Sequence, residues 1–140
     1  DEATDTDFEK EFKRQVEWND AIGNPYVANN DPQLVERIAG TDMVRGVTIA
    51  CGGFFGPQGR RLRLPLADPE LNHKIEQFEY KGLRVTNFEM ESSALAGLST
   101  LMGHHAMTCC MVIANRLAGE ANAGYKNTID GLIKTVLERI

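Results

Sequence analysis

The 140-residue sequence predicts an α/β fold in a single domain, because strand-like runs alternate with helical patterns along the chain. Val44–Cys51 is rich in β-branched residues, as strands are. Ala106–Ala114 is almost continuously apolar, which is typical of a central parallel strand buried on both faces. Between them, β-branched and apolar residues from Arg84 lead directly into a helical segment that continues to Met102. Open α/β sheets bind ligands at such strand-to-helix junctions.

The first predicted helix begins near Phe8. Its apolar residues recur at about every fourth position, at Phe8, Phe12 and Val16, among glutamates and basic residues. Asp7 is placed to cap the start of this helix, and Gly23–Pro25 stops it. Because most of the other positions are charged, we expect a solvated helix on the surface of the protein.

Five further segments complete the predicted fold. A second helix is expected over Asp31–Gly40, with its aspartate as the cap and the following proline in the first turn. Arg61–Leu66 alternates basic and apolar residues, and its proline favours an edge strand. A third helix is expected over Asp68–Gly82 and a final one over Tyr125–Ile140. The polar segment Leu117–Asn122 is expected to form a mobile lid.

Composition excludes several classes of protein. The chain has 15 basic and 20 acidic residues and a net charge of −5, which argues against a nucleic-acid-binding protein. No apolar run is long enough to span a membrane, and the first residues do not have the pattern that predicts a signal peptide. The three cysteines, Cys51, Cys109 and Cys110, lack metal-binding spacing and indicate free thiols in the cytoplasm.

Two carboxylates stand at the strand-to-helix junction. Glu89 and Glu91 are separated only by Met90, and a helical segment follows them. Two acidic groups this close repel each other unless a cation or a pair of adjacent ligand hydroxyls uses both. The alternative is a pair of solvated acids in the first turn of a helix, where the helix dipole favours negative charge.

A second polar segment follows the first predicted strand. Gly52–Arg61 contains four glycines and a proline, but neither the Walker nor the Gly-x-Gly-x-x-Gly pattern. Phe54 can stack on a flat ring, Gln58 offers both donors and an acceptor, and Arg60 offers donors. Uracil presents two carbonyl acceptors and one N–H donor, so these side chains are complementary to it. A flexible surface loop with solvated arginines is the alternative.

Together these segments resemble the nucleoside phosphorylase superfamily, and specifically its uridine phosphorylases. Asn-Phe-Glu-Met-Glu-Ser at Asn87–Ser92 is similar to the ribose-binding motif of that family. Phe54, Gln58 and Arg60, which follow the Gly-Val-Thr of Gly46–Thr48, are similar to its uracil-recognition residues. The extra glycines before Phe54 and the Gly-Pro-Gln-Gly-Arg sequence are modest departures from the family pattern.

The resemblance extends from about Val44 onward and leaves residues 1–24 unassigned. It implies that residues 1–140 form a single partial domain, namely the C-terminal part of a three-layer α/β nucleoside phosphorylase fold with a mixed central sheet. The phosphate-binding segment of the family lies in an N-terminal half that this sequence lacks, so function would require that half. The family also implies a homodimer or hexamer whose subunits complete one another's sites.

The implied reaction converts uridine and phosphate to uracil and ribose 1-phosphate, with phosphate as co-substrate and no cofactor. Glu91 and the Met90 backbone would orient the ribose, with Glu89 in support. Arg60 and Gln58 would stabilise the leaving uracil anion as catalytic residues. The resemblance assigns substrate-binding roles to Phe54, Gln58, Arg60, Phe88, Glu89, Met90, Glu91 and Arg116, of which Arg116 is also expected to be catalytic.

Asn115 narrows the choice of base within the superfamily. The purine phosphorylases and related nucleosidases carry a Ser-Asp at this place, and its acid protonates the purine N7; here Asn115 and Arg116 stand instead. A nucleosidase, a purine phosphorylase, a nucleoside-binding module without catalysis and a purely structural α/β domain remain as alternatives. The preference between uridine, 2′-deoxyuridine and thymidine also stays open.

Overall fold

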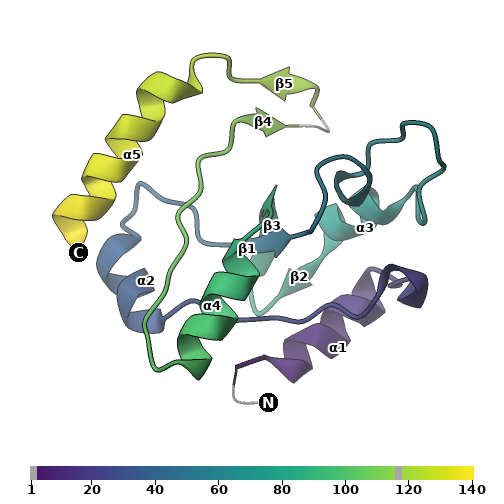
Figure 1. The fold of residues 1–140 in the computed structure, drawn as a ribbon, viewed down its shortest axis with the longest axis horizontal. Helices are drawn as coiled ribbons and strands as arrows, with labels where there is room; N and C mark the ends of the chain where they lie inside the picture. Colours follow the sequence, from purple (N-terminus) through teal and green to yellow (C-terminus); the bar gives the residue numbers. More distant parts are fainter. Residues whose placement is uncertain (1–2, 116–117) are drawn as a thin grey trace.

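The structure, a computed structural model, describes residues 3–115 and 118–140 and has a mixed α/β architecture (Figure 1). The elements in chain order are α1 (Thr6–Gln15), the short 3-10 helix η1 (Asp20–Ile22), α2 (Pro32–Ile38), β1 (Val47–Ala50), the 3-10 helix η2 (Gly56–Gln58), α3 (Leu71–Gln77), β2 (Glu79–Tyr80), β3 (Leu83–Glu89), α4 (Ser92–Leu101), β4 (Ala114–Asn115), β5 (Glu120–Ala121) and α5 (Tyr125–Arg139). The predicted α/β class is therefore confirmed.

The main sheet has the strand order β1-β3-β2 and mixes both pairing directions. β1 runs parallel to β3, with Ala50 opposite Glu89, whereas β2 runs antiparallel to β3. β2 and β3 are joined by a two-residue turn at Lys81 and Gly82, which both have positive φ, as tight hairpin turns require. Gly82 thus closes a hairpin rather than the third helix, which ends earlier, at Gln77.

The hydrophobic core lies where α1 and α3 pack against this sheet. Its buried members are Phe8, Phe12 and Val16 from the α1 segment and Ile75 and Phe78 from the α3 segment. The prediction of a solvated surface helix over the first of these segments is wrong, because its apolar stripe forms a large part of the core. A stripe at helical spacing is what a helix needs to cover a sheet, whatever charges occupy its outer face.

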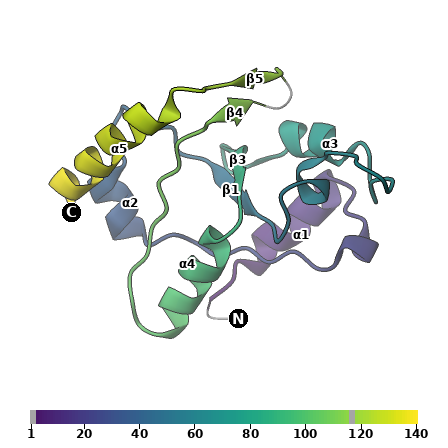
Figure 2. The same ribbon diagram turned by 45° about the horizontal axis from the view of Figure 1, so that its top comes forward.

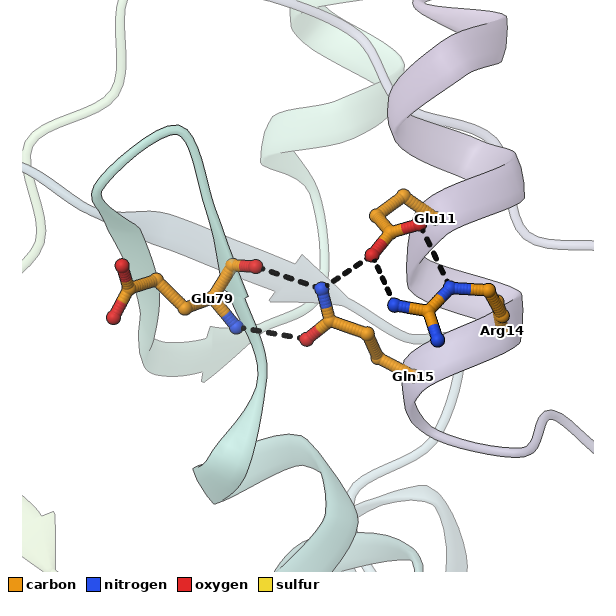
Figure 3. Close-up of polar contacts among 4 residues, drawn as sticks. All are labelled: Glu11, Arg14, Gln15 and Glu79. Atoms are coloured by element: carbon orange, nitrogen blue, oxygen red, sulfur yellow. Dashed lines mark hydrogen bonds and ion pairs between the residues drawn. The ribbon is translucent and has the colours of Figure 1, made fainter.

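Polar contacts also attach α1 to the sheet (Figure 3). The Gln15 side chain donates to the Glu79 carbonyl at 2.8 Å and accepts from the Glu79 N–H at 3.1 Å. It thereby pairs with backbone groups of β2, the outermost strand, which would otherwise face solvent. Glu11 accepts hydrogen bonds from Arg14 and Gln15, and these bonds hold the pKa of Glu11 at about 2.

Two helix caps can be compared with their predicted residues. Asp31 caps α2 by accepting from the backbone N–H groups of Gln33 and Leu34, both at 2.9 Å, so this predicted cap is confirmed. The cap of α1 is Asp5 rather than Asp7, since Asp5 accepts from the N–H of Phe8.

Two predicted strands do not form. Residues 106–113 lack regular secondary structure, and only Ala114 of the apolar run belongs to a strand, β4, which pairs with β5 in a separate sheet. An apolar run becomes a central strand only with strands beside it, and β1 pairs with β3 alone in the described sheet. Arg61–Leu66 is also irregular, with Leu62 and Leu64 exposed, because it finds no strand partner among the described residues.

The C-terminal helix α5 lies beside α2, on the left of both ribbon views (Figures 1 and 2). Arg139 joins them by donating to the Ile38 carbonyl at 2.8 Å and pairing with Asp42 at 2.9 Å. The apolar side chains of α5 include Ile133 and Leu137, which are exposed here. Among the described residues, no helix has the length and apolar character needed to cross a membrane.

Candidate functional site

Two polar segments leave the main sheet at the same edge. Because β1 and β3 are parallel and Ala50 lies opposite Glu89, the loop after β1 and the residues after β3 both begin at the carboxyl ends of paired strands. The loop after β1 carries Phe54, Gln58 and Arg60. Ligand sites of open α/β sheets lie at this edge, so the structure places both predicted segments where a site can form.

The third predicted strand end does not join them in this sheet. Asn115 lies in β4, which belongs to the separate two-stranded sheet with β5. Its side chain accepts a hydrogen bond from the Ala118 N–H at 3.1 Å and so shapes its own turn. Arg116 lies outside the described residues. Leu117, the first residue of the expected lid, also lies outside the described residues. Within that lid, Glu120–Ala121 forms the strand β5.

Glu89 holds the start of α4. Its carboxylate accepts from the N–H groups of Glu91 and Ser92 at 2.8 and 2.7 Å and from the Ser92 hydroxyl at 2.6 Å. Burial by itself raises the pKa of this carboxyl group, but the hydrogen bonds from Ser92 and Glu91 outweigh burial and lower it below the ordinary 4.5. Glu89 is therefore an ionised structural group that orients the backbone around Met90.

This arrangement predicts how Glu89→Gln changes stability with pH. Because the folded-state pKa of Glu89 is lowered, its stabilisation is complete above 4.5 and is lost as the pH falls through the folded-state value. We expect the glutamine variant to lose about 1 kcal/mol of unfolding free energy at neutral pH, since neutral hydrogen bonds are weaker than charge-assisted ones. Denaturant titrations from neutral to acid pH measure the unfolding free energy of the wild-type and Glu89→Gln proteins. If the difference between them does not shrink below pH 4.5, the Glu89 carboxylate does not stabilise the start of α4 in this way.

Glu91 differs from Glu89 in its surroundings. It precedes the first residue of α4, its side chain makes no capping hydrogen bond, and it is exposed, as is Met90. One carboxylate of the pair thus serves the helix while the other faces outward. Phe88 is half-buried and packs against the hydrophobic core.

The loop after β1 folds into a compact cluster around Arg60. Its guanidinium lies 4.1 Å from the ring centre of Phe54 and 4.4 Å from that of Phe55, and it donates to the Phe54 carbonyl. Such cation–π contacts hold the positive charge over the aromatic faces. Gln58 is buried, while Phe54 is about half exposed. Arg60 and Phe54 thus form one unit, and Gln58 lies inside the turn that carries them.

Hydrogen bonds tie the two strand ends together. The Cys51 N–H donates to the Glu89 carbonyl at 3.0 Å, and the Thr48 hydroxyl donates to the Asn87 side chain at 2.7 Å. Burial raises the pKa of the Cys51 thiol, so this thiol favours the protonated, less reactive form. Thr48 and Asn87 are 39 positions apart in the sequence, so no local motif reveals their contact.

Two hollows lie near these segments. One, of about 800 Å³, is lined by residues of β1, of the segment 22–30 and of α4, and also by Gly52 and Phe88. A more open one, of about 760 Å³, lies beside Arg60 and Phe55. Glu91 and Gln58 line neither, so within the described residues the ribose and base segments share a sheet edge without closing a common pocket. No group of three or more potential ligands among those residues could hold a metal ion.

A mixed sheet with two polar segments at the carboxyl ends of parallel strands is typical of α/β domains that bind ligands. Its family follows from the comparison with known proteins: the profile of the phosphorylase superfamily matches residues 1–139, and the chain belongs to that superfamily. This match includes residues 1–24, which motif resemblance had left unassigned. The resemblance to nucleoside phosphorylases is thereby confirmed.

A curated relative adds detail. The chain is 35% identical over 88 residues to a protein named uridine phosphorylase from Thermococcus kodakarensis. The aligned part is 58% of this chain but 29% of the relative, so the chain spans well under half of that protein's length. No solved structure gives a significant match.

Proposed function

We propose that this chain belongs to a pyrimidine nucleoside phosphorylase, which converts uridine and phosphate to uracil and ribose 1-phosphate in nucleoside salvage. The parallel pairing of β1 with β3 carries the proposal, because it brings the Gln58–Arg60 segment and Glu91 to one edge of the sheet. The similarity to a protein named uridine phosphorylase supports the choice of base.

In this proposal the base leaves as an anion stabilised by the loop after β1. The glycosidic bond breaks, the sugar becomes oxocarbenium-like, and phosphate attacks C1′ from the opposite face. Arg60 and Gln58 stabilise the charge that develops on the uracil carbonyl oxygens, and Phe54 stacks on the ring. Arg116 adds a further donor. No side chain acts as a nucleophile, and phosphate is a co-substrate, with no cofactor required.

The residues after β3 orient the sugar. In this account Glu91 accepts hydrogen bonds from the ribose hydroxyls, with the Met90 backbone beside it and Phe88 lining the sugar or base pocket. Glu89 supports both indirectly, because its carboxylate accepts from the N–H groups of Glu91 and Ser92. Hydrogen bonds to a charged acceptor are strong, so Glu91 gives the ribose a defined orientation.

We also propose that residues 1–140 form a single partial domain, the C-terminal part of a three-layer phosphorylase fold. The relative's aligned share of 29% and the exposed apolar side chains of α5 support this arrangement. Phosphate would then be bound by segments outside this sequence. The complete enzyme would be a homodimer or a hexamer.

Glu91→Ala tests the sugar-binding part of the proposal. We expect the variant of the full-length protein to lose about ten- to a hundredfold in kcat/KM for phosphate-dependent uridine cleavage, the cost of a hydrogen bond to a charged group. Glu70→Ala is the matched control, since Glu70 is also an exposed glutamate at the start of a helix, α3.

Ribose 1-phosphate formation is followed directly in the same assay. If Glu91→Ala and Glu70→Ala retain equal activity, Glu91 does not bind the sugar. Uridine cleavage that yields free ribose in both proteins would instead identify a nucleosidase.

A further inference from the structure

Asn72, on α3, contacts the turn that carries Gln58 and Arg60. Its Nδ2 donates to the Gln58 carbonyl at 3.3 Å. Gly59, which follows Gln58 in the turn, has a φ of +76°, a conformation that residues with a side chain rarely adopt. A Cβ built on Gly59 would lie 2.1 Å from Asn72 Nδ2, so the Asn72 amide occupies the space that a side chain would need.

The surroundings of Asn72 favour a role in placing the loop. Its Oδ1 is shielded from solvent and accepts no hydrogen bond from the described residues. An unpaired buried acceptor lowers stability, so an apolar residue would serve a purely structural role better. The same helix is fixed in the core by Ile75, and Phe78 follows it there, so Asn72 connects a rigid element to the turn.

The turn itself determines where Arg60 lies. The Gly59 N–H donates to the Gly56 carbonyl at 2.9 Å, and the Arg60 N–H donates to the Phe55 carbonyl at 3.0 Å. These hydrogen bonds fold the chain back on itself, so that the Arg60 guanidinium lies 4.1 Å from the centre of the Phe54 ring. A displacement of Gly59 would therefore move Arg60 away from the aromatic residues.

We propose that Asn72 is a positioning residue for base recognition, which acts by packing on Gly59 and holding the Gln58 carbonyl. This role of Asn72 in base recognition rests on the proposed function, because Gln58 and Arg60 recognise uracil only in that account. Asn72 does not touch the substrate. It fixes the turn that carries Gln58 and Arg60, where the positive φ of position 59 favours glycine and a Cβ would displace the Asn72 amide.

The test uses Asn72→Ala and the isosteric Asn72→Asp in the full-length protein. Aspartate keeps the volume but removes the donor to the Gln58 carbonyl. We expect both changes to weaken uracil binding about three- to tenfold in calorimetry, the loss of one hydrogen bond, with little change in ribose 1-phosphate binding. Hydrogen exchange of residues 55–60 should accelerate in both variants. His73→Ala, an exposed neighbour on α3, is the matched control and should change neither property.

The exchange measurement requires no activity, so it separates the two proposals. If the wild-type protein fails to bind uracil, the proposed function fails, while exchange still decides whether Asn72 holds the turn. Unchanged exchange in both Asn72 variants would overturn the inference, as would equal losses of uracil and ribose 1-phosphate binding. A double variant adds a steric test: Gly59→Ala should be less harmful when Asn72→Ala is also present, and strictly additive effects would contradict the contact.

Discussion

Arg60→Ala is expected to lower kcat for phosphate-dependent uridine cleavage by about 10²- to 10³-fold, the usual effect of removing one preorganised donor to a developing anion. The guanidinium is held over Phe54 and Phe55, so its charge is in place before the base departs. Since the stabilised charge appears only as the glycosidic bond breaks, kcat should fall more than the affinity for uridine. Steady-state kinetics of the full-length protein give both quantities.

Two further variants make this prediction specific. Arg61→Ala removes an exposed arginine from the same segment and should leave kcat unchanged. Arg60→Lys keeps the positive charge but loses the planar set of donors, so it should recover only part of the activity. Equal kcat values for the wild-type protein and Arg60→Ala would remove Arg60 from the mechanism.

Phe78→Ala is expected to lower the free energy of unfolding by about 3–5 kcal/mol, the range for truncating a buried phenylalanine. Phe78 is fully buried, and its ring centre lies 5.4 Å from that of Phe8 and 5.1 Å from that of Phe12. Its loss would leave a cavity between α1 and α3. Denaturant-induced unfolding of the full-length protein measures the change.

Lys10→Ala is the control for this measurement. Lys10 lies on the exposed side of α1, so its replacement should change the unfolding free energy by less than about 0.5 kcal/mol. If Phe78→Ala lowers the unfolding free energy no more than Lys10→Ala does, the α1 and α3 segments do not share a core.

Much of the local structure follows from short-range chemistry. The Asp31-Pro32 pair begins α2 because a carboxylate cap and a proline in the first turn act within a few residues of each other. The β-branched stretch of β1 and the strand-to-helix change after Glu89 are likewise local. The Asn-Phe-Glu-Met-Glu-Ser motif therefore located the sheet edge correctly, although its two glutamates differ in ways that sequence does not show.

The remaining features depend on distant partners. The stripe from Phe8 to Val16 is compatible with a surface or a core helix, and the packing of Phe78 against it decides between them. The segment 106–113 has the composition of a buried strand, yet a strand exists only when another pairs with it. The contact between Gly59 and Asn72 joins two segments separated by an irregular loop, so no spacing rule reveals it.

The most direct test of the pyrimidine phosphorylase account is cleavage of uridine by the full-length protein with and without phosphate, beside inosine. The account predicts release of uracil and ribose 1-phosphate that depends on phosphate, with inosine inert. Absence of uridine cleavage, or cleavage at the same rate without phosphate, would contradict it, and preferential turnover of inosine would identify a purine enzyme instead.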